Sequence, residues 1–193
     1  MTQIDENIIS RCQAGDKEAF RSLVERCKGM VFSVALKMLA DEEEAKDAVQ
    51  ETFLRVWLNI GKYNPRYHSE SGGSDSSKRF TTWLYAIVSR LCLDRLKSRA
   101  RIVAMPEDES VLRRYASADG QHELENREWA AIVRLLAEGL SPKQRLVFTL
   151  SQLEGLSSEE VEEATGLTAK QVKSNLYVAR QTIRERLKKM GYE

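Results

Sequence analysis

The stretch SSEEVEEATGLTAKQVKSNLYVARQTIRERL at residues 157–187 contains two amphipathic helical segments joined by Thr165-Gly166-Leu167. Ser157 and Glu160 have the spacing of a capping box, in which each side chain satisfies a free backbone amide at the start of a helix. The first helix is therefore expected to begin near Ser157, and Gly166 is expected to end it in a left-handed turn. Two helices joined so closely are typical of a helix-turn-helix.

The second of these helices begins with another capping box, formed by Thr168 and Gln171. Its apolar residues recur at helical spacing and predict a buried face: Val172, Leu176, Ala179, Ile183 and Leu187. The rest of the helix surface is rich in hydrogen-bond donors: Lys170, Gln171, Lys173, Ser174, Asn175 and Arg180. Such donors suit base edges and phosphates in the major groove of DNA, although a merely solvated face has the same composition.

The composition is that of a globular protein without a membrane span. The 193 residues are 42% hydrophobic and 31% charged, enough for one large domain or two small ones. No apolar run approaches the length of about 20 residues that crosses a bilayer. The N-terminus carries Asp5 and Glu6 where a secretion signal would be basic and then apolar. We therefore expect a cytoplasmic protein with no membrane insertion.

The spacing of the cysteines and histidines supports neither a disulfide framework nor a zinc site. Cys12, Cys27 and Cys92 are far apart and odd in number, and His68 and His122 are isolated. Buried, reduced thiols are the expected state. The sequence also lacks a Gly-rich phosphate loop and a nucleophile with a neighbouring base, so we expect neither enzymatic activity nor a cofactor.

The net charge of +1 conceals a strong segregation of charge along the chain. Residues 78–101 carry a net charge of +6, and residues 168–193 carry +5. Residues 41–51 carry −5, and residues 107–128 carry −4. This alternation is typical of a protein that touches nucleic acid at two places and something else between them.

Apolar residues at helical spacing predict three further amphipathic helices, at about residues 20–38, 44–60 and 80–99. No segment alternates with a period of two, so the sequence predicts an all-α fold. A loop rich in Ser and Gly at residues 63–77 interrupts the first part of the chain. Ser141-Pro142 marks another helix start, because proline is tolerated in the first turn.

These breaks predict two small helical domains joined by a flexible acidic linker. The boundaries are placed at residues 1–101 for the first domain, 102–122 for the linker and 123–193 for the domain with the helix-turn-helix.

The predicted helix at residues 44–60 has a polar, acidic side with two leucines on it: Asp47, Gln50, Glu51, Leu54 and Leu58. Leucines four residues apart beside acids would suit a partner protein, although scattered surface leucines are ordinary. The negative charge argues against DNA as that partner.

The predicted helix at residues 80–99 and the residues before it mix aromatic and basic side chains: Arg79, Phe80, Trp83, Tyr85, Arg90, Arg95 and Lys97. Aromatic rings and cations together can hold unpaired bases and phosphates. At this spacing Trp83 is expected in the core, while the sequence leaves Phe80 and Tyr85 open between core and surface.

Four ordered motifs resemble the bacterial RNA polymerase sigma factors of the extracytoplasmic-function (ECF) group, in the sigma-70 family. The motifs are DKEAF at residues 16–20, DAVQETFLRVW at residues 47–57, FTTWLY at residues 80–85, and the segment from SPKQR at residues 141–145 to Arg180. The resemblance covers nearly the whole chain, apart from the Ser/Gly loop and the acidic linker.

The resemblance implies a transcription initiation factor that binds core RNA polymerase, directs it to specific promoters and assists DNA melting. The first domain would bind the clamp of the beta-prime subunit and the minus-ten promoter element. The second would bind the beta flap and the minus-thirty-five element. The linker would thread toward the RNA exit channel, and an anti-sigma factor is a further partner that the resemblance leaves open.

The same resemblance assigns roles to individual positions. The clamp-contacting positions are Asp47, Gln50, Glu51 and Leu54. The minus-ten positions are Arg79, Phe80, Tyr85, Arg90 and Arg95, beside a base-capturing loop at residues 63–79. The minus-thirty-five positions are Lys170, Gln171, Lys173, Ser174, Asn175 and Arg180.

The chain departs from the pattern of the family at a few positions. The minus-ten loop is longer than usual, Arg90 stands where Asn is common, and Asn175 stands where Arg is common. Promoter sequence therefore does not transfer from relatives. Glu162 replaces a small Ala where the two helices of the helix-turn-helix approach, so that it either alters their angle or extends outward.

Two other functions fit parts of the sequence. A free-standing helix-turn-helix repressor would explain the C-terminal domain but would leave the acidic helix and the aromatic, basic helix without a role. A polymerase-binding adaptor would explain the acidic helix but not promoter recognition.

Overall fold

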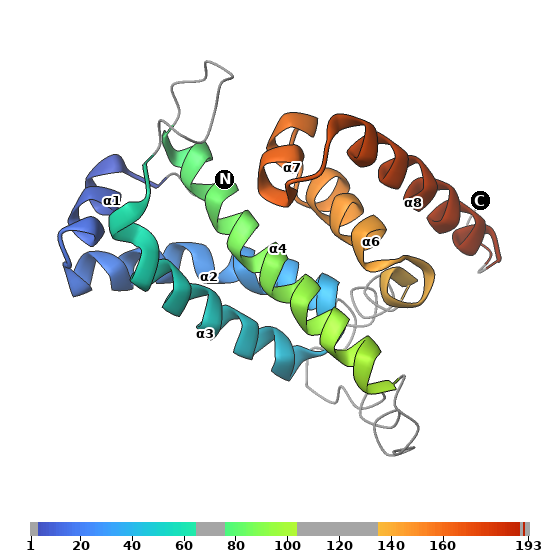
Figure 1. Cartoon of the computed structure of the whole chain (residues 1–193), viewed down its shortest axis with the longest axis horizontal. Helices are drawn as coiled ribbons and strands as arrows, with labels where there is room; N and C mark the ends of the chain where they lie inside the picture. The colour runs from blue at the N-terminus through green and yellow to red at the C-terminus, as the bar shows by residue number, and fades with distance from the viewer. Residues whose placement is uncertain (1–3, 65–75, 104–134, 190, 192–193) are drawn as a thin grey trace.

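The computed structural model describes residues 4–64, 76–103, 135–189 and 191 of the chain (Figure 1). Within these ranges the ordered elements are helices and there is no strand, which confirms the all-α prediction. The helices form an N-terminal group, α1 to α4, and a C-terminal group, α6 to α8. Most of the Ser/Gly loop and the predicted linker lie outside the described residues.

The first three helices each begin after an aspartate whose side chain accepts backbone N–H groups of the first turn. They are α1 (Glu6–Gln13) after Asp5, α2 (Lys17–Leu39) after Asp16, and α3 (Glu42–Asn59) after Asp41. Asp residues favour this position because the carboxylate pairs with free amides and with the positive end of the helix dipole. The helix α2 ends at Ala40, which adopts a left-handed conformation with φ of 57°, and α3 follows directly.

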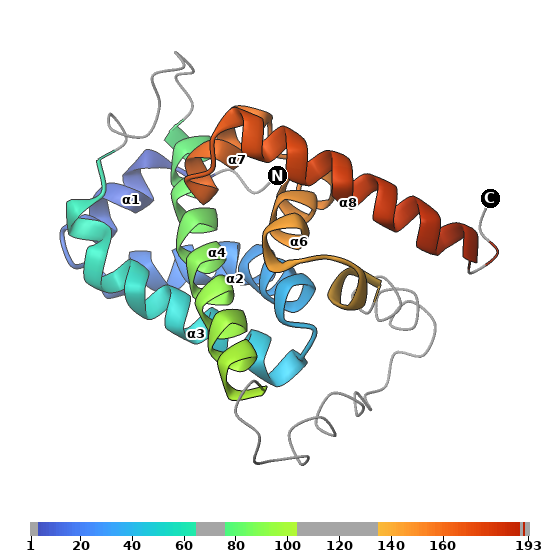
Figure 2. The same ribbon diagram turned by 45° about the vertical axis from the view of Figure 1, so that its right-hand side comes forward.

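A short 3-10 turn, η1 (Ile60–Lys62), follows α3, and α4 (Ser76–Val103) completes the N-terminal domain. The helices α2, α3 and α4 pack against one another, as Figures 1 and 2 both show. Their contact is filled by side chains that are almost completely buried, among them Leu23, Val34, Met38, Val56 and Leu84.

The C-terminal domain begins with a helical segment at residues 135–139, followed by α6 (Pro142–Phe148). Ser141 and Gln144 form a capping box around Pro142, so the predicted helix start is confirmed. The helix α6 continues as a π-helical turn, η4 (Thr149–Leu153), which the sequence pattern did not indicate.

The helix-turn-helix consists of α7 (Ser158–Thr165) and α8 (Ala169–Lys189). Both predicted capping boxes form: Ser157 with Glu160, and Thr168 with Gln171, whose side chains and backbone amides bond reciprocally. Gly166 ends α7 with φ of 69°, in the left-handed region that glycine enters without steric cost. The predicted apolar face of α8 is buried at Val172, Ala179 and Ile183, with Leu176 and Leu187 half-buried.

The two domains share one hydrophobic core. The helix α7 packs on α4 (Figure 2), and α6 touches both α2 and α4. As a result Val161 and Ala164 of α7 belong to the same buried cluster as Leu84 and Val88 of α4. A second, smaller cluster holds the segment at residues 135–139 against α8.

All three cysteines are buried and unpaired, as expected. Burial raises the pKa of Cys27 to about 11 and that of Cys92 to about 12, because a thiolate is poorly solvated inside the core. Among the described residues, no helix has both the length and the apolar character needed to cross a membrane.

Candidate polymerase and nucleic-acid interfaces

One face of α3 combines exposed acidic, amide and leucine side chains. Asp47, Gln50, Leu54 and Leu58 lie on one side of the helix by their spacing, and all four are exposed. The side chains of Leu54 and Leu58 are 58% and 67% exposed. Two large apolar side chains in water beside acids indicate a surface that a partner protein can cover.

Glu51 borders this face but is held by two arginines. Its carboxylate accepts hydrogen bonds from Arg55 at 2.5 Å and from Arg95 of α4 at 3.0 Å. Burial alone would raise the pKa of Glu51, but the hydrogen bonds from Arg95 and Arg55 outweigh it and lower the pKa. Glu51 therefore helps to join α3 to α4, a role that the sequence did not indicate.

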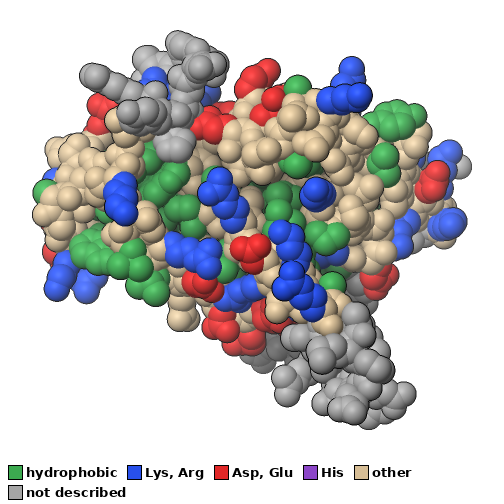
Figure 3. All heavy atoms as spheres, in the orientation of Figure 1, with side chains coloured by type: hydrophobic (Ala, Val, Ile, Leu, Met, Phe, Trp, Pro, Cys, Tyr) green, Lys and Arg blue, Asp and Glu red, His purple; other side chains and the backbone are tan. Residues whose placement is uncertain are grey.

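The outer side of α4 is basic. The spacing of Arg79, Trp83, Arg90, Lys97 and Arg101 places them on one face, and the last three are exposed. Figure 3 shows a band of Lys and Arg side chains along the diagonal course of α4. A row of cations on one long helix is a ready contact for a phosphate backbone.

The aromatic residues of α4 lie mainly in the core. Phe80 is completely buried and Tyr85 is 7% exposed, so neither ring of these two predicted minus-ten residues faces solvent in this structure. Trp83, which was expected in the core, is only half-buried. Its ring lies 4.9 Å from that of Tyr63 and 5.5 Å from that of Phe80. Trp83 is therefore the aromatic ring on the basic face of α4, and Phe80 supports it from beneath.

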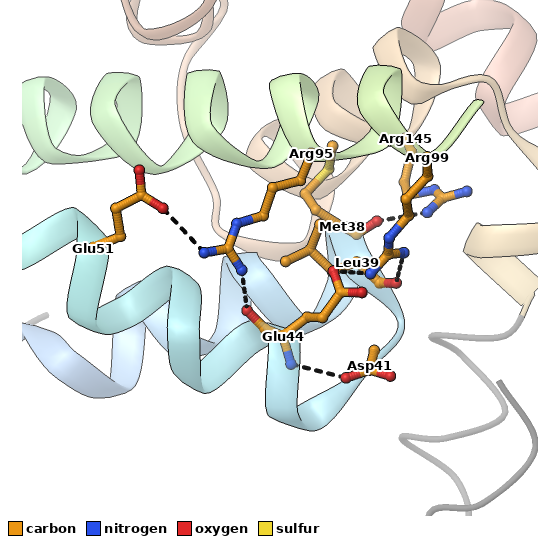
Figure 4. A network of polar contacts seen from close by, with 8 residues as sticks. All are labelled: Met38, Leu39, Asp41, Glu44, Glu51, Arg95, Arg99 and Arg145. Atoms are coloured by element: carbon orange, nitrogen blue, oxygen red, sulfur yellow. Dashed lines mark hydrogen bonds and ion pairs between the residues drawn. The ribbon is translucent and has the colours of Figure 1, made fainter. Parts of the chain in front are cut away.

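Two arginines on the inner side of α4 bind the ends of neighbouring helices (Figure 4). Arg95 donates to the backbone carbonyl of Glu44 at 2.9 Å and to Glu51. Arg99 donates to the carbonyl of Leu39 at 3.0 Å and forms an ion pair with Glu44. Arg95 is thus placed among protein acceptors, whereas Arg90 extends into solvent.

The exposed face of α8 centres on Ser174. Five of the six predicted minus-thirty-five residues are exposed: Lys170, Gln171, Lys173, Ser174 and Arg180. Asn175 is half-buried, and its amide donates to the carbonyl of Gln171 at 2.8 Å.

Arg180 is exposed, but its guanidinium is hydrogen-bonded to another residue of the same domain. Its Nε and Nη2 atoms donate to the side-chain oxygen of Gln152, in η4, at 3.2 and 3.0 Å. This bond joins the end of the π-helical turn to the middle of α8.

Two exposed residues of α8 were missed in the sequence: Tyr177, at 62% exposure, and Val178, at 38%. They lie within one turn of Ser174, on the face that carries Lys170 and Gln171. The sequence did contain a signal for their exposure, because both residues are apolar and neither falls on the buried stripe of α8. An exposed ring and a branched methyl group in this position can contact thymine methyl groups in a major groove.

The described residues contain no group of His, Cys, Asp and Glu side chains that is placed to hold a metal ion.

Comparison with known families accounts for both domains. A model of sigma-70 region 2 matches residues 23–102, and a model of sigma-70 region 4 matches residues 130–183. The two matches follow each other in the order of the two domains and include α3, nearly all of α4, and α8 as far as Ile183.

Curated relatives match over most of the chain. The ECF RNA polymerase sigma factor SigW of Bacillus subtilis is 26% identical, over 93% of this chain and 95% of the relative. SigE of Mycolicibacterium smegmatis is 30% identical, over 93% of this chain and 66% of the relative. The RNA polymerase sigma-H factor of Pseudomonas aeruginosa is 28% identical, over 93% and 91%.

Solved structures share the fold. CnrH, in complex with the cytosolic domain of CnrY, superposes with a TM-score of 0.64 at 22% identity, over 95% of this chain and 97% of that one. RpoE, in complex with the anti-sigma factor NepR from Bartonella quintana, gives 0.61 at 21% identity, over 88% and 96%.

Proposed function

Because the chain belongs to the sigma-70 family, in its extracytoplasmic-function group, we propose that its two domains bind core RNA polymerase and two promoter elements and thereby start transcription at specific sites. The observation that carries this proposal is the coincidence of regions 2 and 4 with an acidic, leucine-bearing face and two basic faces on one chain. Such a factor acts where the polymerase acts, in the cytoplasm, and leaves the chemistry to the polymerase.

The proposed domains are residues 1–101 and 123–193, joined by the acidic segment at residues 102–122. In the first domain, Asp47, Gln50 and Leu54 would contact the beta-prime clamp, with Leu58 extending the same face. Protein–protein interfaces commonly bury apolar side chains at their centre and place polar and charged hydrogen bonds at their rim. Glu51 would support this face of α3 from its border and would not contact the clamp directly, since its carboxylate is bound by Arg55 and Arg95.

The basic face of α4 would guide the opened strand of the minus-ten element. Arg90, Lys97 and Arg101 are exposed and can approach phosphates, and the half-buried ring of Trp83 offers a surface on which a base can stack. Phe80 and Tyr85 would support this face from the core, and Arg95 would hold α4 against α3.

The exposed face of α8 would enter the major groove of the minus-thirty-five element. Gln171 and Ser174 would read bases, Tyr177 and Val178 would supply apolar contacts, and Lys170 with Lys173 would hold phosphates. Arg180 would join them after leaving Gln152. The beta flap would be contacted by the same domain, away from this face.

Run-off transcription with core polymerase on genomic fragments tests the proposal. We expect the full chain to produce discrete transcripts whose start sites share two sequence elements. A chain that binds DNA but neither co-elutes with core polymerase nor yields such transcripts would favour the repressor. Binding to polymerase without specific initiation would favour the adaptor.

Replacement of Gln171 by alanine is expected to relax base preference at one position of the upstream element, at a cost of roughly 1–3 kcal/mol of binding free energy. Replacement of Lys170 by alanine is the matched control, because it should weaken binding to all sequences alike and reduce the salt dependence. A binding selection with randomised upstream sequence measures both. An unchanged preference in the Gln171 variant would remove it from the set of base-reading residues.

An anti-sigma factor is a further proposed partner. The support is the likeness in fold to chains whose structures were solved with such proteins, CnrH with CnrY and RpoE with NepR.

A further inference from the structure

The hydroxyl of Tyr177 is held in place on the exposed side of α8. The side-chain amide of Gln181, one turn further along the helix, donates to the hydroxyl oxygen of Tyr177 at 2.7 Å. Both residues are exposed. Side chains on a helix point back toward its N-terminus, so Gln181 reaches over the turn that carries Tyr177. Because a tyrosine has only two χ angles, a hydrogen bond at its tip limits the ring to few orientations.

Tyr177 and Gln181 continue a stripe of exposed residues that begins in the proposed DNA-facing surface. Lys170, Ser174, Tyr177 and Gln181 are spaced by four, three and four residues, which places them on one side of α8. Tyr177 lies about 4.5 Å further along the helix axis than Ser174, a step similar to the roughly 3.4 Å between neighbouring base pairs. The stripe can therefore continue from one base pair to the next.

The direction of the hydrogen bond decides what the tyrosine can offer to DNA. A phenol hydroxyl carries one proton and also accepts through its oxygen. Since Gln181 donates to this oxygen, the pair does not use the proton of Tyr177. The proton is available to an acceptor that lies in front of α8.

We propose that Tyr177 is a specificity-determining residue for a thymine in the upstream element, and that Gln181 is its positioning residue. This inference rests on the proposed function. In the major groove, thymine presents the O4 acceptor beside its C5-methyl group, so the hydroxyl can donate to O4 while the ring covers the methyl group. Cytosine presents an amino group and no methyl group, so it would face the proton of Tyr177 with another donor.

Two substitutions separate the roles of the ring and of the hydroxyl. Tyr177→Phe keeps the ring and its contact with the methyl group but loses the hydroxyl. Gln181→Glu replaces the donor by an acceptor, so the hydroxyl of Tyr177 turns its proton to the carboxylate and offers only its lone pairs to the base. The polarity of the contact is then reversed, and an amino group becomes its partner. A purely structural role of Gln181 would not produce this reversal.

The test is a binding selection with randomised upstream sequence, carried out with the full chain bound to core polymerase. It first identifies the position at which Tyr177→Phe relaxes the preference. Affinities are then measured for duplexes with thymine, uracil, 5-methylcytosine or cytosine at that position. We expect the parent to bind the thymine duplex about five- to tenfold more tightly than the 5-methylcytosine duplex. Tyr177→Phe should bring these two within about twofold, and Gln181→Glu should bind 5-methylcytosine more tightly. Thymine should exceed uracil in all three proteins, because each keeps the ring.

Arg184→Gln is the matched control, because it lowers the charge of α8 by one unit, as Gln181→Glu does, at another exposed position. It should weaken binding to all four duplexes alike. Circular dichroism should show equal helicity in all variants, since the substituted side chains are exposed. A Gln181→Glu variant that still prefers thymine as the parent does, or a Tyr177→Phe variant that relaxes no position, would overturn the inference. A parent that selects no upstream element would reject the proposed function itself, and the inference with it.

Discussion

Replacement of Phe80 by alanine is expected to lower the free energy of unfolding by about 3–5 kcal/mol, the largest effect on stability that we predict. Phe80 is completely buried, and its ring packs edge-on against Tyr63 at 5.4 Å. Removing the ring leaves a cavity into which the neighbouring helices can collapse only in part. Urea denaturation followed by circular dichroism measures the loss.

Phe80→Leu is the control, because it keeps most of the volume and should cost under about 1.5 kcal/mol. A loss below about 1 kcal/mol in the alanine variant would show that this ring is not part of the core. It would also return Phe80 to the candidates for direct contact with the minus-ten element.

Replacement of Leu54 by aspartate is expected to weaken binding to core polymerase by on the order of 100-fold, as for an apolar hot spot at the centre of an interface. Leu54 is 58% exposed, so the change should not affect folding. A carboxylate at this position would lose its water on binding without gaining a partner. Equilibrium binding of labelled core polymerase measures the affinity.

Val178→Asp in α8 is the matched control, since it introduces the same charge at an exposed apolar residue of the other domain. It should preserve polymerase binding and impair recognition of the upstream element. If both aspartate variants bind core polymerase normally, the clamp assignment of α3 is wrong.

Helix starts were the part of the fold that the sequence predicted best. Capping depends on a side chain and a backbone amide two or three residues away, so Ser157, Thr168 and Ser141 carry the information locally. The buried stripe of α8 was predictable for the same reason. The helix α1, of eight residues, and the π-helical turn η4, of five, were not predicted, since each is too short for an apolar repeat to be recognised.

The residues of the binding surfaces were harder to predict. Helical spacing shows to which side of its own helix a side chain points, but not which residue of another helix it meets. Arg95 was expected to contact DNA, yet it points to Glu51 and to the carbonyl of Glu44, which lie far away in the sequence. Tyr85 was left open, and its hydroxyl meets Glu154 from the other domain. Contacts between domains depend on three-dimensional arrangement, and no local pattern in one helix contains them.

The buried thiols bear on how readily an oxidant could react with this protein. With a pKa of about 11, Cys27 is a thiolate in only about one molecule in ten thousand near neutral pH. Peroxides react with thiolates, and Cys92, with a pKa of about 12, is less ionised still. These two cysteines are therefore poor oxidation sensors while the core is intact. A reaction of these two thiols with an oxidant would first require the core to open.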